Sequence, residues 1–547
     1  MPTLSYGDKA VDLVAGKTLF EHADALKARV PTSCGRNGQC HECIVEVVSG
    51  DGALSPATEA EGFLRPPYRL ACQARVVDTA RDVRFALLRR NPQILVRGRE
   101  SGLAPSQRTP GFAGVDPFVH RRGDRVVWGD RDVDAYRGRI CGIAVDVGTT
   151  TVALNLMDLE SGVCLGTSAF ENPQRFGGSD VMNRISYDSG AFRGELHKSI
   201  LNGLNHEIRE VCRGLRLPRR TIYEVVIVGN ATMRDLFFGL DVQSIGEKPY
   251  KSIIEHERDA GRRVTTTLET TARDLGLHIH PGAHVASGPL VGCHIGADVA
   301  ADLLSVGMDR ERDVVMLVDI GTNTEVVVGN CERMLAASCP AGPAFEGGLV
   351  TYGMPGYDGA IQSVAVRNGG FDYRTIGDAP AEGLCGSGLI DLLAALRRAG
   401  KMDELGVFPE DVDRYVVAPD RGITFSREDV SHLAQAKAAN SCGQRIVMRQ
   451  YGVAPDRIKR LYLAGGFANY IDIRHAIEIG LIPNLPEDRI EKVGNASLQG
   501  ATALLLSRKK RETLEGLVRR ITHVELETVS DFFEFFVEGC MFKPMDG

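Results

Sequence analysis

The stretch Val145-Asp-Val-Gly-Thr-Thr-Thr151 recurs further along this 547-residue chain as Val318-Asp-Ile-Gly-Thr-Asn-Thr324. In each copy an apolar run ends near an aspartate, a Gly-Thr turn follows, and a second apolar run begins. This order predicts two strands joined by a tight turn. Because the pattern occurs twice, we expect a duplicated protein in which two similar halves face each other across a cleft.

The sequence beyond the repeat extends the duplication. Each copy is followed later by a strand that runs into a glycine-containing turn and a helix, at 225–233 in the first half and at 461–467 in the second. From residue 139 onward strands alternate with helical stretches, which indicates an α/β architecture. We therefore expect one lobe at 139–310 and a second lobe at 311–547.

The two turns have the chemistry of a phosphate-binding site. A glycine at the tip lets backbone N–H groups approach phosphate oxygens, and neighbouring hydroxyl groups donate further hydrogen bonds. Asp146 and Asp319 are expected to end their strands at one cavity, where carboxylates hold a hydrated Mg²⁺ that bridges the phosphates. The residues expected to bind the phosphates are Gly148, Thr149, Thr150, Thr151, Gly321, Thr322 and Asn323.

Two further segments each allow two interpretations. Gly386 and Ser387 precede an apolar helix, so they suit contact with a phosphate or ribose at the helix N-terminus. A tight turn that only packs a strand against a helix explains the same residues. Asn172-Pro-Gln174 is expected on a loop at the cleft or at a partner face, but it could simply shape a turn.

Four cysteines near the start, Cys34, Cys40, Cys43 and Cys72, follow the spacing C-x5-C-x2-C-x28-C and predict a 2Fe-2S cluster. Glycines between the first two ligands allow the sharp turns that bring three thiolates onto one loop. Zinc is the alternative, but zinc ribbons usually carry two close cysteine pairs, and here only one pair is close. His41 lies between ligands, and a solvated loop residue is its simpler interpretation.

The order of elements around these cysteines is that of a β-grasp ferredoxin. A short strand pair and a helix precede the cysteine loop, and strands at 44–48 and 83–87 follow it. We expect this domain at 1–88. The segment 89–138 is rich in Arg, Gly and Pro, and we expect a linker or small middle region there. Its Trp128, the only tryptophan, is expected to serve packing.

Bulk properties exclude some classes of function. The net charge of −7 argues against non-specific nucleic-acid binding, so no nucleic-acid partner is expected. The start of the chain lacks a cationic region followed by an apolar run, and no stretch of about 18 apolar residues occurs. We expect a cytoplasmic protein without a membrane partner. The other nine cysteines show no repeating spacing and are expected to be reduced thiols.

The chain resembles the superfamily of acetate and sugar kinases, heat-shock ATPases and actin. The stretch 145–151 is similar to its first phosphate motif, 318–324 to its second, and 461–467 to its adenosine motif. The resemblance implies ATP bound between two ribonuclease-H-like lobes whose closure is coupled to the nucleotide state. It adds Gly465, Gly466 and Phe467 as candidates for nucleotide binding.

Further segments resemble the reductive activators of corrinoid proteins. They include Glu171-Asn-Pro-Gln174, Gly178-Ser-Asp180, Gly229-Asn-Ala-Thr-Met, Ser338-Cys-Pro-Ala-Gly-Pro-Ala-Phe-Glu346, Gly383-Leu-Cys-Gly386 and Val493-Gly-Asn-Ala. Such activators couple a 2Fe-2S domain to an ATPase and return inactive Co(II) corrinoid to the methyl-accepting Co(I) state. The resemblance covers about residues 25–75 and 140–545. The segment 89–138 is short for the family's middle domain, which is associated with dimer formation, so a homodimer is left open.

The resemblance also implies a mechanism and partners. Ferredoxin-type clusters have potentials near about −400 mV, whereas Co(II) corrinoids are reduced at lower potential, so ATP supplies the missing drive. Asp146 and Asp319 would organise Mg²⁺, and Glu325 is assigned the positioning of the attacking water. The implied client is a corrinoid protein. The electron donor is an unidentified ferredoxin, flavodoxin or reductase.

Three other functions remain open from the sequence. The first is the activation of another low-potential enzyme, such as a 2-hydroxyacyl-CoA dehydratase, although the four-cysteine loop on a separate domain argues against it. The second is a small-molecule kinase with a ferredoxin-like appendage, which requires a phosphoryl acceptor. The third is a non-enzymatic, redox-responsive protein that binds nucleotide without hydrolysing it.

Overall fold

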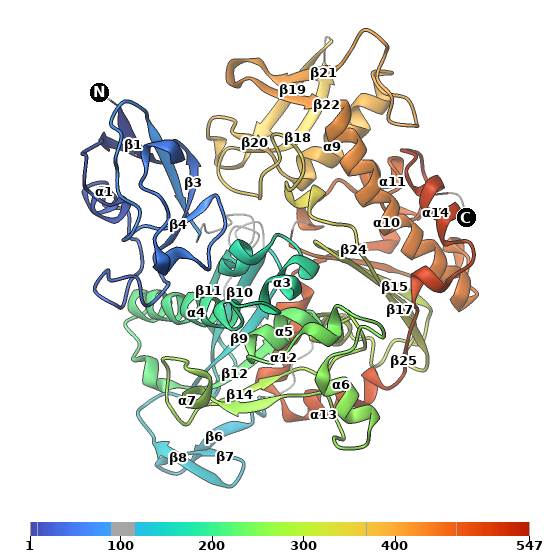
Figure 1. Ribbon diagram of the computed structural model, residues 1–547. Coiled ribbons are helices and arrows are strands. Elements are labelled where there is room, and N and C mark those ends of the chain that lie inside the picture. The colour runs from blue at the N-terminus through green and yellow to red at the C-terminus, as the bar shows by residue number, and fades with distance from the viewer. Residues whose placement is uncertain (1, 8, 89–114, 368, 467, 546–547) are drawn as a thin grey trace.

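The computed structural model describes residues 2–7, 9–88, 115–367, 369–466 and 468–545. Figure 1 shows the N-terminal domain in blue next to helix α4 of the first lobe, with the second lobe in yellow to red on the other side of the molecule. The expected α/β class, with a ferredoxin-like domain followed by two related lobes, is confirmed. No helix of the described residues is long and apolar enough to cross a membrane.

The N-terminal domain is a five-stranded sheet in the order β2-β1-β5-β3-β4 with one helix against it. Strand β1 runs parallel to β5, and the remaining pairs are antiparallel. Helix α1 begins with a capping box between Thr18 and Glu21 and buries Leu19 and Phe20 in the core. The elements are β1 (Thr3–Tyr6), β2 (Lys9–Asp12), α1 (Leu19–Ala25), β3 (Ile44–Ser49), β4 (Tyr68–Leu70) and β5 (Val83–Leu87).

The described part of the expected linker, residues 115–138, contains a small antiparallel sheet. Its strands are β6 (Val119–Arg122), β7 (Arg125–Trp128) and β8 (Arg131–Ala135). The Trp128 ring stacks on the buried His284 ring of the first lobe with centroids 4.4 Å apart. Trp128 is therefore a packing residue that joins this sheet to the first lobe, as expected.

The first lobe has a six-stranded sheet in the order β11-β10-β9-β12-β14-β13. The predicted strand–turn–strand unit is β9 (Cys141–Val147) and β10 (Thr151–Asp158), and the strand beside β9 is β12, which runs parallel to it. The other strands are β11 (Cys164–Glu171), β12 (Ile222–Val228), β13 (Glu269–Thr271) and β14 (His284–Ser287). The helices are η3 (Pro173–Gly177), α3 (Val181–Asp188), α4 (Glu195–Gly214), α5 (Ala231–Phe237), α6 (Ile253–Asp259), α7 (Ala272–Leu275) and α8 (Ala297–Ser305).

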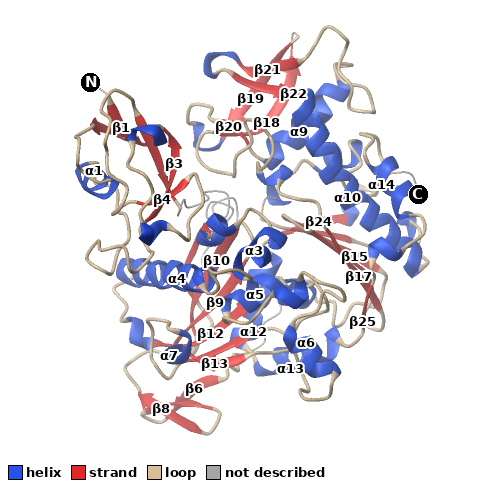
Figure 2. Cartoon of the chain, in the orientation of Figure 1, coloured by secondary structure: helices blue, strands red, loops and turns tan. Residues whose placement is uncertain are grey.

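The second lobe repeats this plan with the order β24-β23-β15-β16-β17-β25. Its strand–turn–strand unit is β15 (Val315–Ile320) and β16 (Thr324–Gly329), and β23 runs parallel to β15. The other strands of this sheet are β17 (Met334–Cys339), β23 (Leu461–Ala464), β24 (Ile490–Gly494) and β25 (Ile521–His523). Helices flank both six-stranded sheets (Figure 2). The helices of the second half are η6 (Ala344–Glu346), α9 (Gly386–Arg398), α10 (Arg427–Tyr451), α11 (Ile473–Glu478), α12 (Ala496–Leu506), α13 (Arg508–Val518) and α14 (Phe532–Gly539).

Two small sheets extend the second lobe. They consist of β18 (Ala360–Arg367), β19 (Gly370–Thr375) and β20 (Gly383–Leu384) in one, and of β21 (Arg414–Ala418) and β22 (Ile423–Ser426) in the other. The second sheet lies just before the long helix α10, whose N-terminus is closed by a capping box of Ser426 and Asp429.

The two halves exchange helices at their junction. Helix α12 lies late in the sequence, but it packs against α8 and against β9 and β12 of the first lobe. At the crossing of the two helices a Cβ on Gly500 would lie 2.1 Å from the backbone oxygen of Ala301, so only glycine fits there. A helix of the expected second lobe therefore packs against the sheet of the first lobe.

Candidate functional site

A cavity of about 170 Å³ lies between the two lobes. The turns of both repeats line it, as the sequence predicts for two halves that share a cleft. Its described lining contains five carboxylates, and none of the lining residues is Lys or Arg. Of the sequence-predicted site residues, the lining includes Asp146, Gly148, Thr149, Thr150, Thr151, Asp319, Gly321, Thr322, Asn323, Glu325, Gly386, Gly465 and Gly466.

Both turns are closed by a backbone hydrogen bond from their glycine, to the third residue onward in the first turn and to the second residue onward in the second turn. The amide of Gly148 donates to the carbonyl of Thr151, and the amide of Gly321 donates to the carbonyl of Asn323, each at 3.0 Å. A Cβ on Gly148 would lie 2.6 Å from the Thr151 oxygen, so this turn requires glycine. The duplicated sequence thus folds into two tight turns that differ in their closing hydrogen bond and both line the cavity.

Glu346 joins the two turns. The hydroxyls of Thr150 and Thr322 lie 3.2 Å apart and both donate to one carboxylate oxygen of Glu346, from Thr150 at 3.0 Å. Burial raises the pKa of Glu346. The sequence predicts no role for Glu346, because its contact with both turns depends on how η6 folds back over the cleft.

Asp146 and Asp319 each meet a residue from the opposite half. The side-chain amide of Asn495, at the start of α12, donates to Asp146 at 2.9 Å. Asp319 shares a hydrogen bond with Asp302 of α8, and Asp302 accepts from the hydroxyl of Ser497 at 2.8 Å. Burial raises the pKa of Asp146 to about 7 and that of Asp319 to about 6.

Two more carboxyl groups complete the acidic side of the cavity. Asp298 lies at the start of α8, and burial raises its pKa to about 8. Glu325 pairs with Asp319 across the β15–β16 ladder and accepts from the hydroxyl of Ser338 at 3.1 Å. Burial also raises the pKa of Glu325.

Carboxylates without a lining cation are a donor set that suits a divalent metal ion. In the part of the chain that the structure describes, no three His, Cys, Asp or Glu side chains form a ready-made metal site. Mg²⁺ usually keeps several waters and binds through one or two carboxylates together with substrate phosphates. The residues present therefore fit a hydrated Mg²⁺ held by Asp146 and Asp319.

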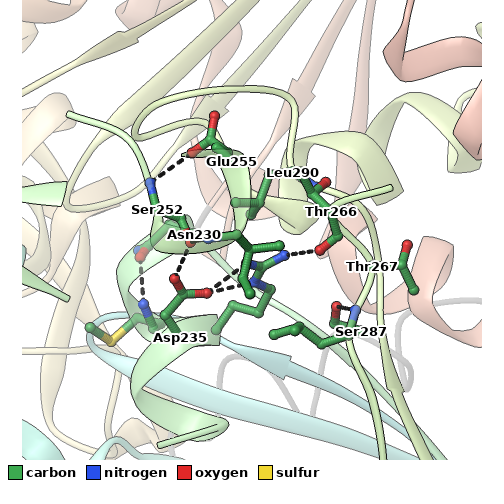
Figure 3. A network of polar contacts seen from close by, with 12 residues as sticks. Asn230, Asp235, Ser252, Glu255, Thr266, Thr267, Ser287 and Leu290 are labelled. Atoms are coloured by element: carbon green, nitrogen blue, oxygen red, sulfur yellow. Dashed lines mark hydrogen bonds and ion pairs between the residues drawn. The ribbon is translucent and has the colours of Figure 1, made fainter. Parts of the chain in front are cut away.

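Asn230 enters the site from the first lobe. It caps α5 by accepting from the amide of Met233 at 2.9 Å, and its amide donates to Thr149 at 3.1 Å. Behind it the fully buried Arg234 donates to Asp235 and to the carbonyl of Thr266, and Ser252 donates to Asp235 (Figure 3). Because these buried charges are paired, the start of α5 is held rigidly against the cleft.

The candidate adenosine side combines residues inside and outside the cavity. Gly465 has φ of +115°, and a Cβ there would lie 2.2 Å from the backbone oxygen of Ile320, so glycine is required. Gly386 lines the cavity, whereas Ser387 is buried and donates to the carbonyl of Gln362 at 2.9 Å. Gly386 thus fits the interpretation as a phosphate or ribose contact, whereas Ser387 fits the interpretation as a packing turn. Phe467 lies outside the described residues.

The four predicted cluster ligands lie together in the N-terminal domain. The sulfur atoms of Cys43 and Cys72 are 3.4 Å apart and buried. Those of Cys34 and Cys40 both lie 3.9 Å from the hydroxyl of Thr32 and are half-buried. Four cysteine thiols, three on one loop and one after a strand end, are the donor set that a 2Fe-2S cluster requires.

The surroundings favour the thiolate form of Cys34 and Cys72, whereas the hydrogen bond to Cys72 and burial raise the pKa of Cys43. Burial opposes ionisation of Cys34, but backbone amides of Cys40, Asn37 and Gln39 bond to its sulfur and lower its pKa to about 6. A hydrogen bond from the Cys43 thiol lowers the pKa of Cys72 to about 6. Thiolates are the metal-binding form of cysteine, so the donor set fits the cluster.

His41 is not the solvated loop residue that the sequence suggested. Its side chain is 19% exposed, its ring stacks on Phe63 with centroids 4.0 Å apart, and its Nδ1 lies 2.7 Å from a carboxylate oxygen of Glu195 in α4. The expectation was wrong because the partner residue comes from a lobe 154 positions away in the sequence.

Several site residues were missed as individual residues. Asn230 and Asn495 both stand in a Gly-Asn-Ala tripeptide before a helix, and this recurrence was the available signal. The two tripeptides are not equivalent in the duplication, because one follows β12 and the other follows β24. Asp298 and Asp302 gave no comparable signal, since they are two acidic residues in a helix that is otherwise mostly apolar.

Three family profiles match successive parts of the chain. They describe a 2Fe-2S iron-sulfur cluster binding domain at 6–77, the RACo middle region at 141–311, and the C-terminal domain of RACo, the ASKHA domain, at 313–546. These matches confirm a domain for a 2Fe-2S cluster and an ATPase domain of the actin type, which supports ATP binding.

Known proteins match over most of the chain. The chain is 34% identical to the corrinoid activation enzyme RamQ of Eubacterium limosum, over 76% of this chain and 74% of that protein. It is 23% identical to the [Co(II) methylated amine-specific corrinoid protein] reductase of Methanosarcina barkeri, over 72% and 76%. A solved structure of a reductive activator for a corrinoid, iron-sulfur protein superposes with a TM-score of 0.72 at 28% identity, over 100% of this chain and 99% of that one.

Proposed function

This chain belongs to the family of reductive activators of corrinoid proteins, and from that premise we propose that it transfers one electron to an inactive Co(II) corrinoid protein in a step that depends on MgATP. The product is the Co(I) state that accepts a methyl group. The observation that carries the proposal is the presence, in one chain, of a four-cysteine cluster loop and a two-lobed cleft lined by paired phosphate turns.

When bound, the 2Fe-2S cluster supplies a one-electron carrier, and MgATP supplies the free energy for the uphill transfer. The chain's own residues have defined tasks. Asp146 and Asp319 hold Mg²⁺, and the turns at 148–151 and 321–323 bind the phosphates through backbone amides and hydroxyls. Cys34, Cys40, Cys43 and Cys72 ligate the cluster.

Two carboxyl groups are candidates for positioning the water that attacks ATP. Glu325 was the sequence candidate, and it lies in the cavity opposite Asp319 in the β15–β16 ladder. Glu346 contacts the hydroxyls of both phosphate turns. We assign the water to Glu325, because Glu346 already bridges the two lobes. If hydrolysis survives in Glu325→Gln and is lost in Glu346→Gln, the roles are reversed.

The partners follow from the same function. The client is a corrinoid protein, and the reduced state of the cluster is maintained by a ferredoxin, a flavodoxin or a reductase. The described lining of the cleft holds no cation for a second anionic substrate, which argues against phosphoryl transfer to a phosphorylated or acidic acceptor.

The deciding experiment is optical. The full chain with its cluster reduced is mixed with a Co(II) corrinoid protein, with and without MgATP, and the Co(I) absorption band is followed. We expect Co(I) only with MgATP, and we expect its loss in Cys43→Ser and in Asp319→Ala. If ATP is hydrolysed but cobalt stays Co(II) with several corrinoid proteins, the client class is wrong, and dehydratases and phosphoryl acceptors are tested next.

A further inference from the structure

One single-turn helix, η3, contacts both functional parts of the molecule. Its N-cap is Asn172, a fully buried residue of the Asn-Pro-Gln segment. The backbone amide of Asn172 donates to the carbonyl of Thr150, and its side-chain amide donates to the carbonyl of Gly148, both at 2.8 Å. One end of η3 is therefore bonded to the backbone of the first phosphate turn.

The other end of η3 is bonded to the cluster domain. Nε of Arg175 donates to the hydroxyl of Tyr68 at 3.1 Å, and Nη2 of Arg175 donates to the carboxylate of Glu46 at 2.7 Å. These partners lie on β4 and β3, and β4 leads directly into the ligand Cys72. Arg175 also pairs with Glu171 in its own lobe, so it links two carboxylates across the domain boundary.

An aromatic contact runs beside this polar one. Phe176 of η3 packs edge-on against Phe63 with centroids 5.8 Å apart, and His41 stacks on the same Phe63 ring. The hydroxyl of Tyr187 donates to the carbonyl of Phe63 at 2.6 Å. Because His41 lies between two cluster ligands, this column connects η3 to the cysteine loop itself.

In this arrangement α4 covers one side of the cluster loop, beside the N-terminal domain in Figure 1. The amide of Asn202 donates to the carbonyl of Cys40, and the ammonium of Lys198 donates to the carbonyl of Gln39, both at 3.3 Å. Glu195 contacts His41. These contacts occupy polar groups of the loop through which an electron would leave for a second protein.

We propose that η3 couples occupancy of the phosphate turn to docking of the cluster domain, with Arg175 as the positioning residue. The inference rests on the proposed function. The turn at 148–151 is the one assigned to phosphate binding, and two of its carbonyls, those of Gly148 and Thr150, are held by Asn172. A shift of the turn toward bound phosphate displaces these carbonyls, and a buried Asn172 must follow them or lose both hydrogen bonds. Arg175 and Phe176 then move away from the cluster domain, and the cysteine loop is released.

The contacts of this boundary suit such a release. Beside the buried aromatic contact of Phe176 with Phe63 they include hydrogen bonds and ion pairs of partly exposed side chains such as Arg175 and Glu46, as in interfaces that open and close. Nucleotide can shift this equilibrium only if it binds the released state more tightly. By reciprocity, weakening the docked state must then tighten nucleotide binding.

The test is hydrogen–deuterium exchange of the full chain with its cluster in place, followed in peptides that cover 39–43 and 195–202. The probe is Mg²⁺ with the non-hydrolysable analogue AMP-PNP, and no corrinoid protein is present. We expect the analogue to speed exchange in both regions of the wild-type chain several-fold. In Arg175→Met we expect fast exchange without nucleotide, no further response to it, and a dissociation constant for AMP-PNP about 3- to 10-fold lower than in the wild type.

Arg29→Met is the matched control. Arg29 faces Glu210 of α4 across the same boundary at 3.8 Å and its side chain is 77% exposed, and among the described hydrogen bonds and ion pairs none joins it to η3. We expect the wild-type response in this variant and a partial response in Arg175→Lys, which keeps the charge but loses the planar fork. Cluster absorption verifies folding of every variant.

The inference is overturned if AMP-PNP leaves exchange unchanged or slows it in the wild type, or if Arg175→Met matches Arg29→Met. Its failure is separable from that of the proposed function, because the exchange readout needs no cobalt. If Co(I) does not form but the hydrogen–deuterium exchange still responds to AMP-PNP, only the assignment of a corrinoid protein as the client is rejected.

Discussion

The two lobes carry the same strand–turn–strand unit, yet neither lobe completes its own half of the site. Asp146 of the first lobe receives a hydrogen bond from Asn495 of the second half, and Asp319 of the second lobe shares one with Asp302 of the first. The duplication therefore explains the two turns, and the exchange of α8 and α12 explains why the turns act as one site.

The partners also differ in chemistry. The amide of Asn495 donates to Asp146, whereas Asp319 meets the carboxyl group of Asp302. Burial raises the pKa of Asp302, and the hydrogen bond between the two carboxyl groups lowers the pKa of Asp319, so Asp302 is the member of this pair that keeps its proton.

The largest effect is expected from Asp319→Asn. We expect ATP hydrolysis to fall ~10²–10³-fold, the range for removal of one preorganised electrostatic contact, and to fall less in Asp146→Asn, whose neighbour Asn495 can still contact the amide. Phosphate release measures both rates, and cluster absorption should stay unchanged. Equal losses in the two variants would show that the two lobes share the cation evenly.

Two buried cations, one in each lobe, differ in how their charge is compensated. Arg234 of the first lobe is fully buried and paired with Asp235, while Lys437 in α10 is 2% exposed and donates only to the carbonyl of Gly480, at 3.4 Å, among its described hydrogen bonds. The charge of Arg234 is thus balanced by a carboxylate, whereas the charge of Lys437 is compensated, among the described hydrogen bonds, only by one long bond to a carbonyl.

Arg234→Met should therefore destabilise the protein by about 3–5 kcal/mol, because Asp235 would remain as an uncompensated buried charge. Denaturant unfolding of the nucleotide-free chain measures this change. A loss below about 1 kcal/mol would mean that Ser252 alone satisfies Asp235.

Lys437→Met should stabilise the protein, and the size of this stabilisation should depend on pH. Burial lowers the pKa of Lys437 from 10.5 to about 7. Between these values the unfolded chain binds a proton that the folded protein does not, so folded-state stability falls as pH decreases from about 10 to about 7. The variant does not lose stability in this way. Its free energy of unfolding should therefore exceed that of the wild type by a larger margin at pH 7 than at pH 10, and the two margins should differ by ~2 kcal/mol or more. Melting curves at both pH values decide the point, and a gain independent of pH would contradict it.

The smallest effect is expected at the helix caps. Asn495→Ser keeps a cap for α12 but removes the amide that bonds to Asp146, and we expect a decrease of about 10-fold in kcat, the equivalent of one lost hydrogen bond to a charged group. Asn230→Ser removes the bond to Thr149 and should change KM more than kcat, because that hydroxyl belongs to the phosphate turn. If both variants change only KM, Asn495 does not act through Asp146.

Much of the architecture was readable because it repeats or follows a strict spacing. The Asp-Gly-Thr turns at 145–151 and 318–324 predicted β9–β10 and β15–β16, and the cysteine spacing predicted the cluster domain that the family profile confirms. Such patterns are local. A tight turn requires its glycine, and a loop that carries several metal ligands requires a fixed spacing between them, whatever the fold of the rest of the chain.

The remaining features were decided by the tertiary structure. No local sequence pattern predicted that α12 would pack against the first lobe or that Glu346 would contact both turns. Nor did one predict that His41 would stack on Phe63 next to α4. Each of these depends on residues that are distant in the sequence and meet only after packing. The sequence thus determined which chemical groups the protein carries and the turns that present them. Packing of the two halves and the cluster domain decided which groups meet, because hydrogen bonds and burial between distant segments exist only in the folded chain.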